Sequence, residues 1–131
     1  MIGLRLIGIL GAAMLVAAPL RVEAHHSAVM FDDQKDVTFE GVVKEFVWRN
    51  PHSFLRVDVT DKAGVTKTWA LEWGSTGQLA QAKMTRTTLK PGDKLLITGQ
   101  PSRDSNDDAP RLLLQTVKRV SDGWSWSGRV E

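Results

Sequence analysis

Hydrophobic and polar residues alternate along much of the chain after residue 36, which is typical of β-strands that bury one face. We expect five strands, at residues 37–48, 54–61, 66–74, 94–99 and 111–120. The expected inward positions in the second, third and fifth strands are Leu55, Val57 and Val59, then Trp69, Leu71 and Trp73, then Leu112, Leu114 and Val117. The pattern therefore predicts one hydrophobic core enclosed by a sheet.

Turn residues and one helical stretch separate these strands. Asn50-Pro51-His52 reads as a turn, since proline restricts the residue before it and lacks a backbone donor. Asp61–Gly64 closes a hairpin, and Lys90–Asp93 leads into the fourth strand. Residues 75–84 contain helix formers after a Ser-Thr start, which predicts one short helix.

The first expected strand has apolar residues on both faces. Val37, Phe39, Val43 and Val47 share one parity, and Val42, Phe46 and Trp48 share the other. Gly41 lies where a strongly coiled strand would bend or bulge. A coiled first strand and one helix between strands three and four are the layout of an OB-fold. We therefore predict a mainly β protein, a small five-stranded OB-like barrel. The alternative is an open antiparallel sheet with one helix packed on it.

Residues 1–24 read as a cleaved signal peptide. Arg5 precedes an uncharged run from Leu6 to Leu20, and Val22-Glu23-Ala24 fits a cleavage site. As a helix the run would span about 22 Å, short of the roughly 30 Å hydrocarbon core that a membrane anchor must cross. We expect a periplasmic or secreted protein that has no membrane association once the signal is removed.

The mature chain divides into an arm at 25–36, the barrel at 37–120 and a tail at 121–131. Val29, Met30 and Phe31 are expected to staple the arm to the barrel. Trp124 and Trp126 are expected to cap one end of it.

Composition narrows the functions that this domain could have. The chain has 17 Lys and Arg against 15 Asp and Glu, with no concentrated basic stripe, so we expect no nucleic-acid partner. It has no Cys, which excludes disulfides, thiolate metal sites and a cysteine nucleophile. Glu40 and Glu72 could be buried carboxylates, but no spacing pairs them as acid and base. We expect a binding protein and not an enzyme.

Several motifs of the chain are shared with a known family. They are His25-His26-Ser27, Phe31-Asp32, residues 37–46, Trp48, Asn50-Pro51-His52-Ser53 and Leu89–Asp93. With them the chain resembles an uncharacterised exported bacterial family, domain of unknown function 6152, over nearly the whole mature length. The resemblance implies export and small size, and it supplies no catalytic residues.

The three histidines suggest a metal site. Cleavage after Ala24 would make His25 the first residue, whose amine and imidazole could chelate one metal ion, with a second imidazole from His26 or His52. Amine and imidazole nitrogens in this geometry suit copper. Cleavage one residue earlier would put His26 at the third position, a square-planar Cu(II) or Ni(II) chelator.

The alternative is a metal-free accessory module. In an OB-fold the loop between strands one and two helps line the ligand face. Here that loop carries Trp48, Asn50 and His52, which could contact an unknown small ligand or a periplasmic partner protein. His52 could also cap backbone groups of the turn, and the His pair could be a plain N-terminal tail.

Overall fold

The computed structural model describes residues 30–104 and 108–130, so the signal peptide, His25 and His26 lie outside the described residues. The elements, in chain order, are β1 (Val37–Val47), β2 (Phe54–Thr60), β3 (Thr66–Glu72), α2 (Thr76–Gln81), β4 (Lys94–Pro101), β5 (Arg111–Arg119) and β6 (Ser125–Ser127). Within the described ranges, no helix is long and apolar enough to cross a membrane.

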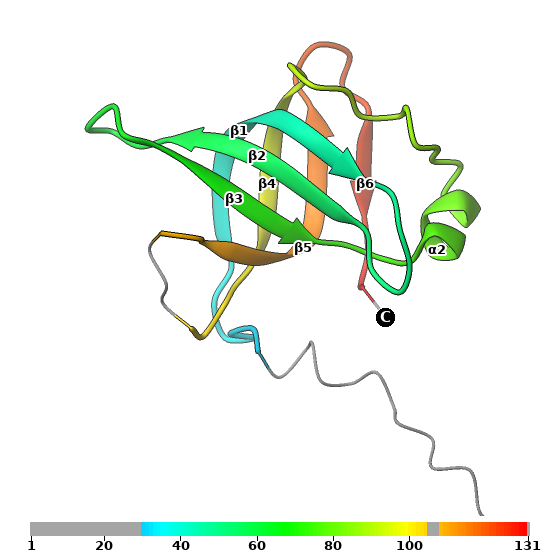
Figure 1. Cartoon of the computed structure of the whole chain (residues 1–131), viewed down its shortest axis with the longest axis horizontal. Helices are drawn as coiled ribbons and strands as arrows, with labels where there is room; N and C mark the ends of the chain where they lie inside the picture. The colour runs from blue at the N-terminus through cyan, green and yellow to red at the C-terminus, as the bar shows by residue number, and fades with distance from the viewer. Residues whose placement is uncertain (1–29, 105–107, 131) are drawn as a thin grey trace, which may run out of the picture.

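The strands form one sheet that curls into a closed barrel (Figure 1). Neighbouring strands follow the order β3-β2-β1-β4-β5-β6, and β3 also pairs with β5. That closing pair is parallel and joins Ala70–Glu72 to Arg111–Leu113, whereas the other pairs are antiparallel. The predicted five-stranded barrel with one helix between strands three and four is confirmed, and the open sheet is excluded. The short β6, in the expected tail, was not predicted.

A bulge explains the two apolar faces of β1. The register with β2 shifts between Val43 and Glu45, so the inward positions change parity there. Val43 is buried before the bulge, and Phe46 lies opposite buried Leu55 after it. The break comes after Gly41, which is instead a point of close approach, since a Cβ there would lie 3.2 Å from Val57.

The core fills the barrel largely as the alternation predicted. It comprises Val43, Leu55, Val57, Leu71, Trp73, Leu79, Met84, Leu89, Leu95, Ile97, Leu112, Leu114 and Val117. Trp69 and Val59 are only half-buried, against the prediction, because they lie toward the hairpin that projects beyond the barrel (Figure 1). Trp69 packs there on Phe39, with ring centroids 4.7 Å apart.

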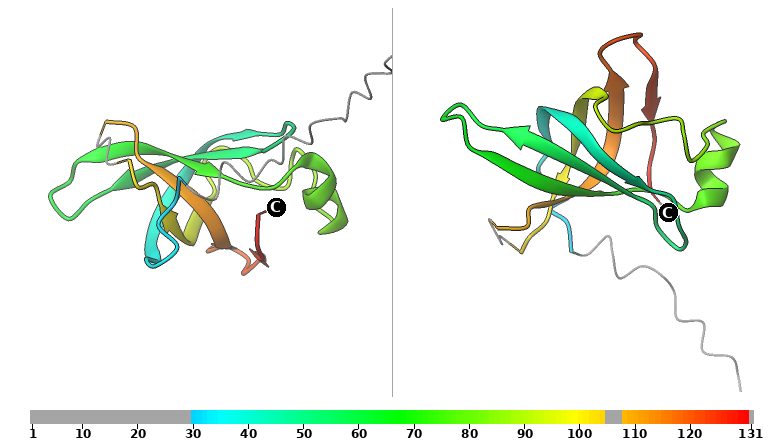
Figure 2. Two further views of the ribbon diagram at one scale, coloured as in Figure 1. Left: turned by 90° about the horizontal axis from the view of Figure 1, so that it is seen from below. Right: turned by 45° about the horizontal axis from the view of Figure 1, so that its top comes forward.

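The helix α2 is shorter than the predicted 75–84. Ser75 caps its start by accepting a hydrogen bond from the Gln78 backbone at 3.1 Å. The helix ends before Lys83, whose φ of 60° lies in the left-handed region. Figure 2 shows α2 at one end of the barrel, beside the C-terminal end of the described chain. There Gln78 Nε2 donates to the carbonyl of Arg129 at 2.8 Å.

The tail packs against this end of the barrel. The rings of Trp126 and Trp73 meet edge to face with centroids 5.1 Å apart, so Trp126 caps the core as expected. Trp124 also packs against the core, and the Arg119 guanidinium lies beside it, with Cζ 5.6 Å from the ring centroid.

The N-terminal arm docks at the C-terminal end of β4. Phe31 is buried and forms an antiparallel bridge with Ser102. Arg103 Nε donates to the Phe31 carbonyl at 2.8 Å, and its Nη2 donates to Asp33 at 3.0 Å. Met30 is 45% exposed, so it does not staple the arm, and Val29 lies outside the described residues. Phe31 is the side chain that anchors this segment.

Candidate functional site

The loop between β1 and β2 is closed by Ser53, which is fully buried. The Ser53 hydroxyl accepts from the Arg49 backbone N–H at 3.3 Å and donates to the Arg49 carbonyl at 3.2 Å. The Ser53 backbone exchanges hydrogen bonds with Gly74 and Trp73, both at 2.9 Å. The loop is therefore tied at its base to the end of β3, and the Asn50-Pro51 peptide within it is cis.

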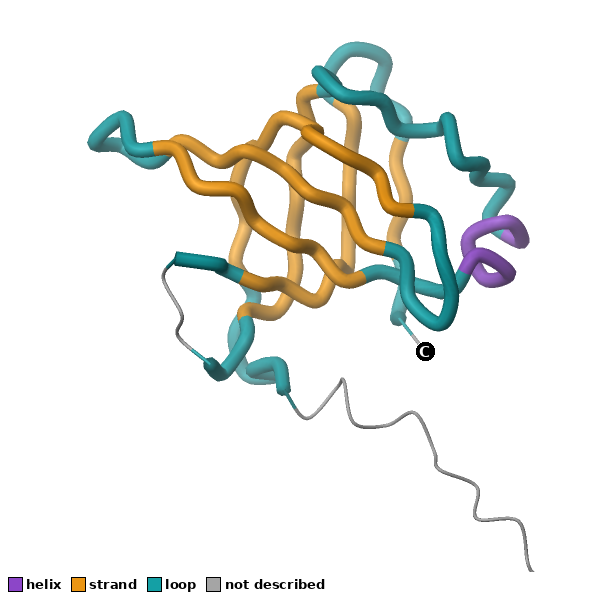
Figure 3. The backbone as a smooth tube through the Cα atoms, viewed as in Figure 1, coloured by secondary structure: helices purple, strands orange, loops and turns teal. Residues whose placement is uncertain are grey.

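Asn50 ties the same loop to the start of α2. Its Oδ1 accepts hydrogen bonds from the backbone and hydroxyl of Thr76, at 3.0 and 2.9 Å. Figure 3 shows the loop and the helix at the same end of the barrel. The amide oxygen of Asn50 therefore already has a structural role, and its Nδ2 is the group left to contact a ligand.

Trp48 lies at the start of this loop and is half-buried. Its ring meets Phe46 edge to face with centroids 5.8 Å apart, and Phe46 packs in turn on Trp73 at 5.7 Å. Trp48 thus joins the aromatic cluster at this end of the barrel and keeps part of its surface open to solvent.

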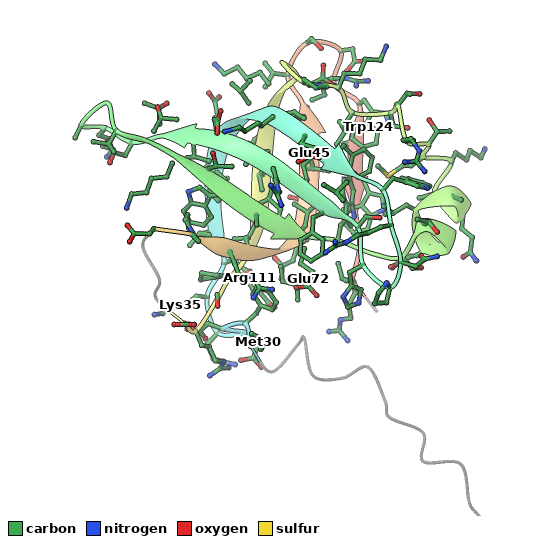
Figure 4. The ribbon with its side chains drawn as sticks, in the orientation of Figure 1. Met30, Lys35, Glu45, Glu72, Arg111 and Trp124 are labelled. Carbon is green, nitrogen blue, oxygen red and sulfur yellow. The ribbon has the colours of Figure 1, made fainter. Side chains whose placement is uncertain are left out.

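His52 makes the most informative contact of the loop. Its Nδ1 lies 2.8 Å from Glu72 Oε1, and Glu72 Oε2 accepts from Arg111 Nη2 at 3.3 Å. The Glu72 side chain is only 5% exposed, against 14% for His52 and 39% for Arg111. Figure 4 shows Glu72 and Arg111 side by side, where the ends of β3 and β5 meet. The closing seam of the barrel therefore places a buried carboxylate between an imidazole and a guanidinium.

This arrangement orients the His52 imidazole and leaves its Nε2 available to bind a ligand or to exchange a proton. In a neutral imidazole, a carboxylate at Nδ1 favours the tautomer with its proton there, in which Nε2 has a free lone pair. The same carboxylate–imidazole pairing orients metal-bound histidines and histidines that transfer protons. Nε2 has no hydrogen bond to any other described residue.

The docked arm leads to this group. The Arg111 guanidinium carbon lies 5.9 Å from the ring centroid of Phe31. A continuous set of contacts therefore runs from Phe31 through Arg111 and Glu72 to His52.

The sequence predicted only some of these residues. It named His52 as a candidate and Glu72 as a carboxylate that could be buried, but gave Glu72 no partner. It missed Arg111, because the parallel pairing of β3 with β5 joins residues far apart in sequence. Its other candidate carboxylate, Glu40, is exposed and pairs with Lys94 at 3.1 Å, so the expectation of burial was wrong there.

The structure describes only part of the predicted set of metal ligands. Among residues 30–104 and 108–130, no group of three or more His, Asp or Glu side chains could hold a metal ion. Of the three predicted metal ligands, His52 lies within the described residues and its Nε2 has no hydrogen-bond partner there, while His25 and His26 lie outside them.

A comparison with models of protein families identifies the family of this chain. Residues 13–110 match the model of a family of unknown function, DUF6152. The chain belongs to this family. No curated protein and no solved structure matches the chain. The DUF6152 match includes the loop with His52 and the end of β3 with Glu72, and it ends one residue before Arg111.

Proposed function

We propose that this protein is an exported binding protein of the periplasm or the extracellular space that holds a transition metal, with copper as the best fit. The proposed ligands are the N-terminal residues His25 and His26, exposed by signal cleavage, and the Nε2 atom of His52. The observation that carries the proposal is the 2.8 Å contact between His52 and buried Glu72. It gives His52 the supporting carboxylate typical of a metal-bound imidazole.

The docked arm supports the proposal by its reach. Phe31 is fixed next to Arg111, which contacts the same carboxylate as His52. The five Cα–Cα steps from His26 to Phe31 can extend about 17 Å. From this anchor, we expect the N-terminal pair to approach His52 without a rearrangement of the barrel.

The donor set favours copper. A terminal amine and neutral imidazoles are intermediate ligands that suit Cu(II), and a T-shaped or square-planar arrangement matches its tetragonal preference. Cleavage after Ala24 supplies the amine and ring of His25, and cleavage one residue earlier supplies His26 with two backbone nitrogens. His52 would complete the first arrangement directly.

Calorimetric titration of the processed protein with Cu(II) tests the proposal, after mass spectrometry has established the first residue. We expect His52→Ala to weaken Cu(II) binding about tenfold or more, since one of three nitrogen ligands is lost. His25→Ala with His26→Ala should abolish specific binding. If the His52→Ala protein binds Cu(II) as tightly as the wild type, His52 is not a ligand. If the protein without histidines binds equally well, the metal proposal is wrong.

We also propose a metal-free role for the same loop as a second candidate. It is supported by the fixed shape of the loop, which Ser53 and Asn50 tie to β3 and α2. A preformed loop with Trp48 and His52 partly open can bind a small molecule or a partner protein without an ordering cost. In this case His52→Ala should weaken the partner and loss of His25 and His26 should not. The opposite result would favour the metal.

A further inference from the structure

The loop carries a cation without an acidic partner. Arg49 is exposed, and its guanidinium carbon lies 4.8 Å from the ring centroid of Phe54. Within the part of the chain that the structure describes, no carboxylate pairs with Arg49. Stacking on the ring holds the guanidinium in place, and its N–H donors point outward in the plane of the group.

The sheet brings this cation close to the group around Glu72. Phe54 is the register partner of Glu72 on the outer face, since the adjacent pair Leu55 and Leu71 faces the core. Neighbouring strands lie about 4.8 Å apart, and β3 lies between β2 and β5. Glu72 is therefore flanked on one side by β2, where Arg49 stacks on Phe54, and on the other by β5, which carries Arg111.

The charges of this surface do not cancel. Arg49 has no carboxylate partner among the described residues, and Arg111 shares Glu72 with His52. Glu72 engages one Nη of Arg111, whose side chain is 39% exposed, so other N–H donors of that guanidinium remain accessible. A surplus positive charge beside two forked donors is the arrangement that binds carboxylates bidentately.

We propose that the surface beside His52 binds a small dicarboxylate anion, one carboxylate on Arg49 and the other on Arg111. β2, which carries Phe54, and β5, which carries Arg111, lie two strand spacings apart, about 10 Å, a span that a dicarboxylate with a few carbons can bridge. The proposal rests on the role of this loop as a binding site, but it requires no metal.

Titration of the metal-free protein with succinate, followed by NMR of the arginine side-chain N–H groups, tests this. We expect saturable shifts at Arg49 and Arg111, with acetate binding about tenfold more weakly because it bridges one guanidinium only. Arg49→Met keeps an apolar stem on Phe54 and should weaken succinate about threefold to tenfold. The matched control Arg86→Met, in an exposed turn, should leave succinate binding unchanged.

Two outcomes would overturn the inference. One is the absence of saturable shifts, and the other is equal succinate affinity in Arg49→Met and wild type while the indole signals show an intact fold. Inorganic phosphate serves as a second probe, and phosphate binding stronger than succinate binding would contradict the dicarboxylate assignment. Because no metal is present, failure here leaves the copper proposal untouched.

Discussion

The guanidinium of Arg111 lies between the ring of Phe31, 5.9 Å from its centroid, and the carboxylate of Glu72, 3.3 Å away. Phe31 belongs to the N-terminal arm and Glu72 to the closing strand of the barrel. The arm and the carboxylate that orients His52 therefore contact one shared side chain.

Phe31→Ala should release the arm from the barrel. Removing a buried aromatic ring costs about 3 kcal/mol or more of unfolding free energy, because a cavity replaces its contacts. Urea unfolding measures this loss, with Met30→Ala as the control, since Met30 is 45% exposed. Under the copper proposal Phe31→Ala should also weaken Cu(II) binding. Equal stability of the two variants would show that the Phe31 contact does not anchor the arm.

Glu72→Ala should destabilise the fold strongly. It leaves His52 and Arg111 without their buried carboxylate, and breaking such a group costs about 3 kcal/mol. Glu40→Ala is the matched control, because Glu40 is exposed and its pair with Lys94 contributes about 1 kcal/mol at most. Urea unfolding that ranks the two variants equally would contradict the central position of Glu72.

Trp73→Phe should destabilise the fold much less than Trp73→Ala, although Trp73 is fully buried. Its Nε1 has no hydrogen-bond partner within the described structure, so the smaller ring removes an unsatisfied buried donor. That gain offsets part of the lost packing against Phe46 and Trp126. Trp73→Ala should instead cost about 3–5 kcal/mol. A loss in Trp73→Phe as large as in Trp73→Ala, measured in urea, would show that the donor is satisfied.

Asp122 should stabilise the fold in a pH-dependent way. Hydrogen bonds from Arg119, and then from the Trp124 backbone, lower the pKa of Asp122 below 3.8. Since the folded pKa is depressed, the stabilisation is present above the unfolded pKa and is lost as the pH falls through the folded one.

Comparison of Asp122→Asn with the wild type in urea, from pH 6 downward, checks this. The difference in unfolding free energy should be constant near neutral pH and should shrink below about pH 3.8. A difference that does not change with pH would mean that the bonds to Arg119 do not favour the ionised carboxylate.

Local patterns were enough to predict the barrel and its single helix. Alternation placed Leu55, Leu71 and Leu112 in the core, and the Ser75 cap is visible in the sequence. The bulge after Val43 was not visible, because both faces of that strand carry apolar residues. β6 was missed because Ser125–Ser127 is too short to show a period.

The site was predictable only in part. His52 stands out because histidines are few and the turn around it is distinctive. The β2–β3 hairpin brings Glu72 next to His52, since it pairs Phe54 with Glu72. Arg111 joins them through the three-residue parallel pairing of β3 with β5, which no local pattern encodes. Arg111 and Glu72 are 39 positions apart along the chain, and a single sequence contains no signal that joins them.

The parallel seam of Ala70–Glu72 with Arg111–Leu113 closes the barrel through contacts that are distant in sequence. Distant pairings of this kind are slow to form, since a long intervening chain must first be ordered. Glu72 and Arg111 belong to this seam, so a chain that has formed its hairpins but has not closed would lack the contact between them. Under the proposed function, the protein would gain its full binding capacity only in a late step of folding, when this last junction forms.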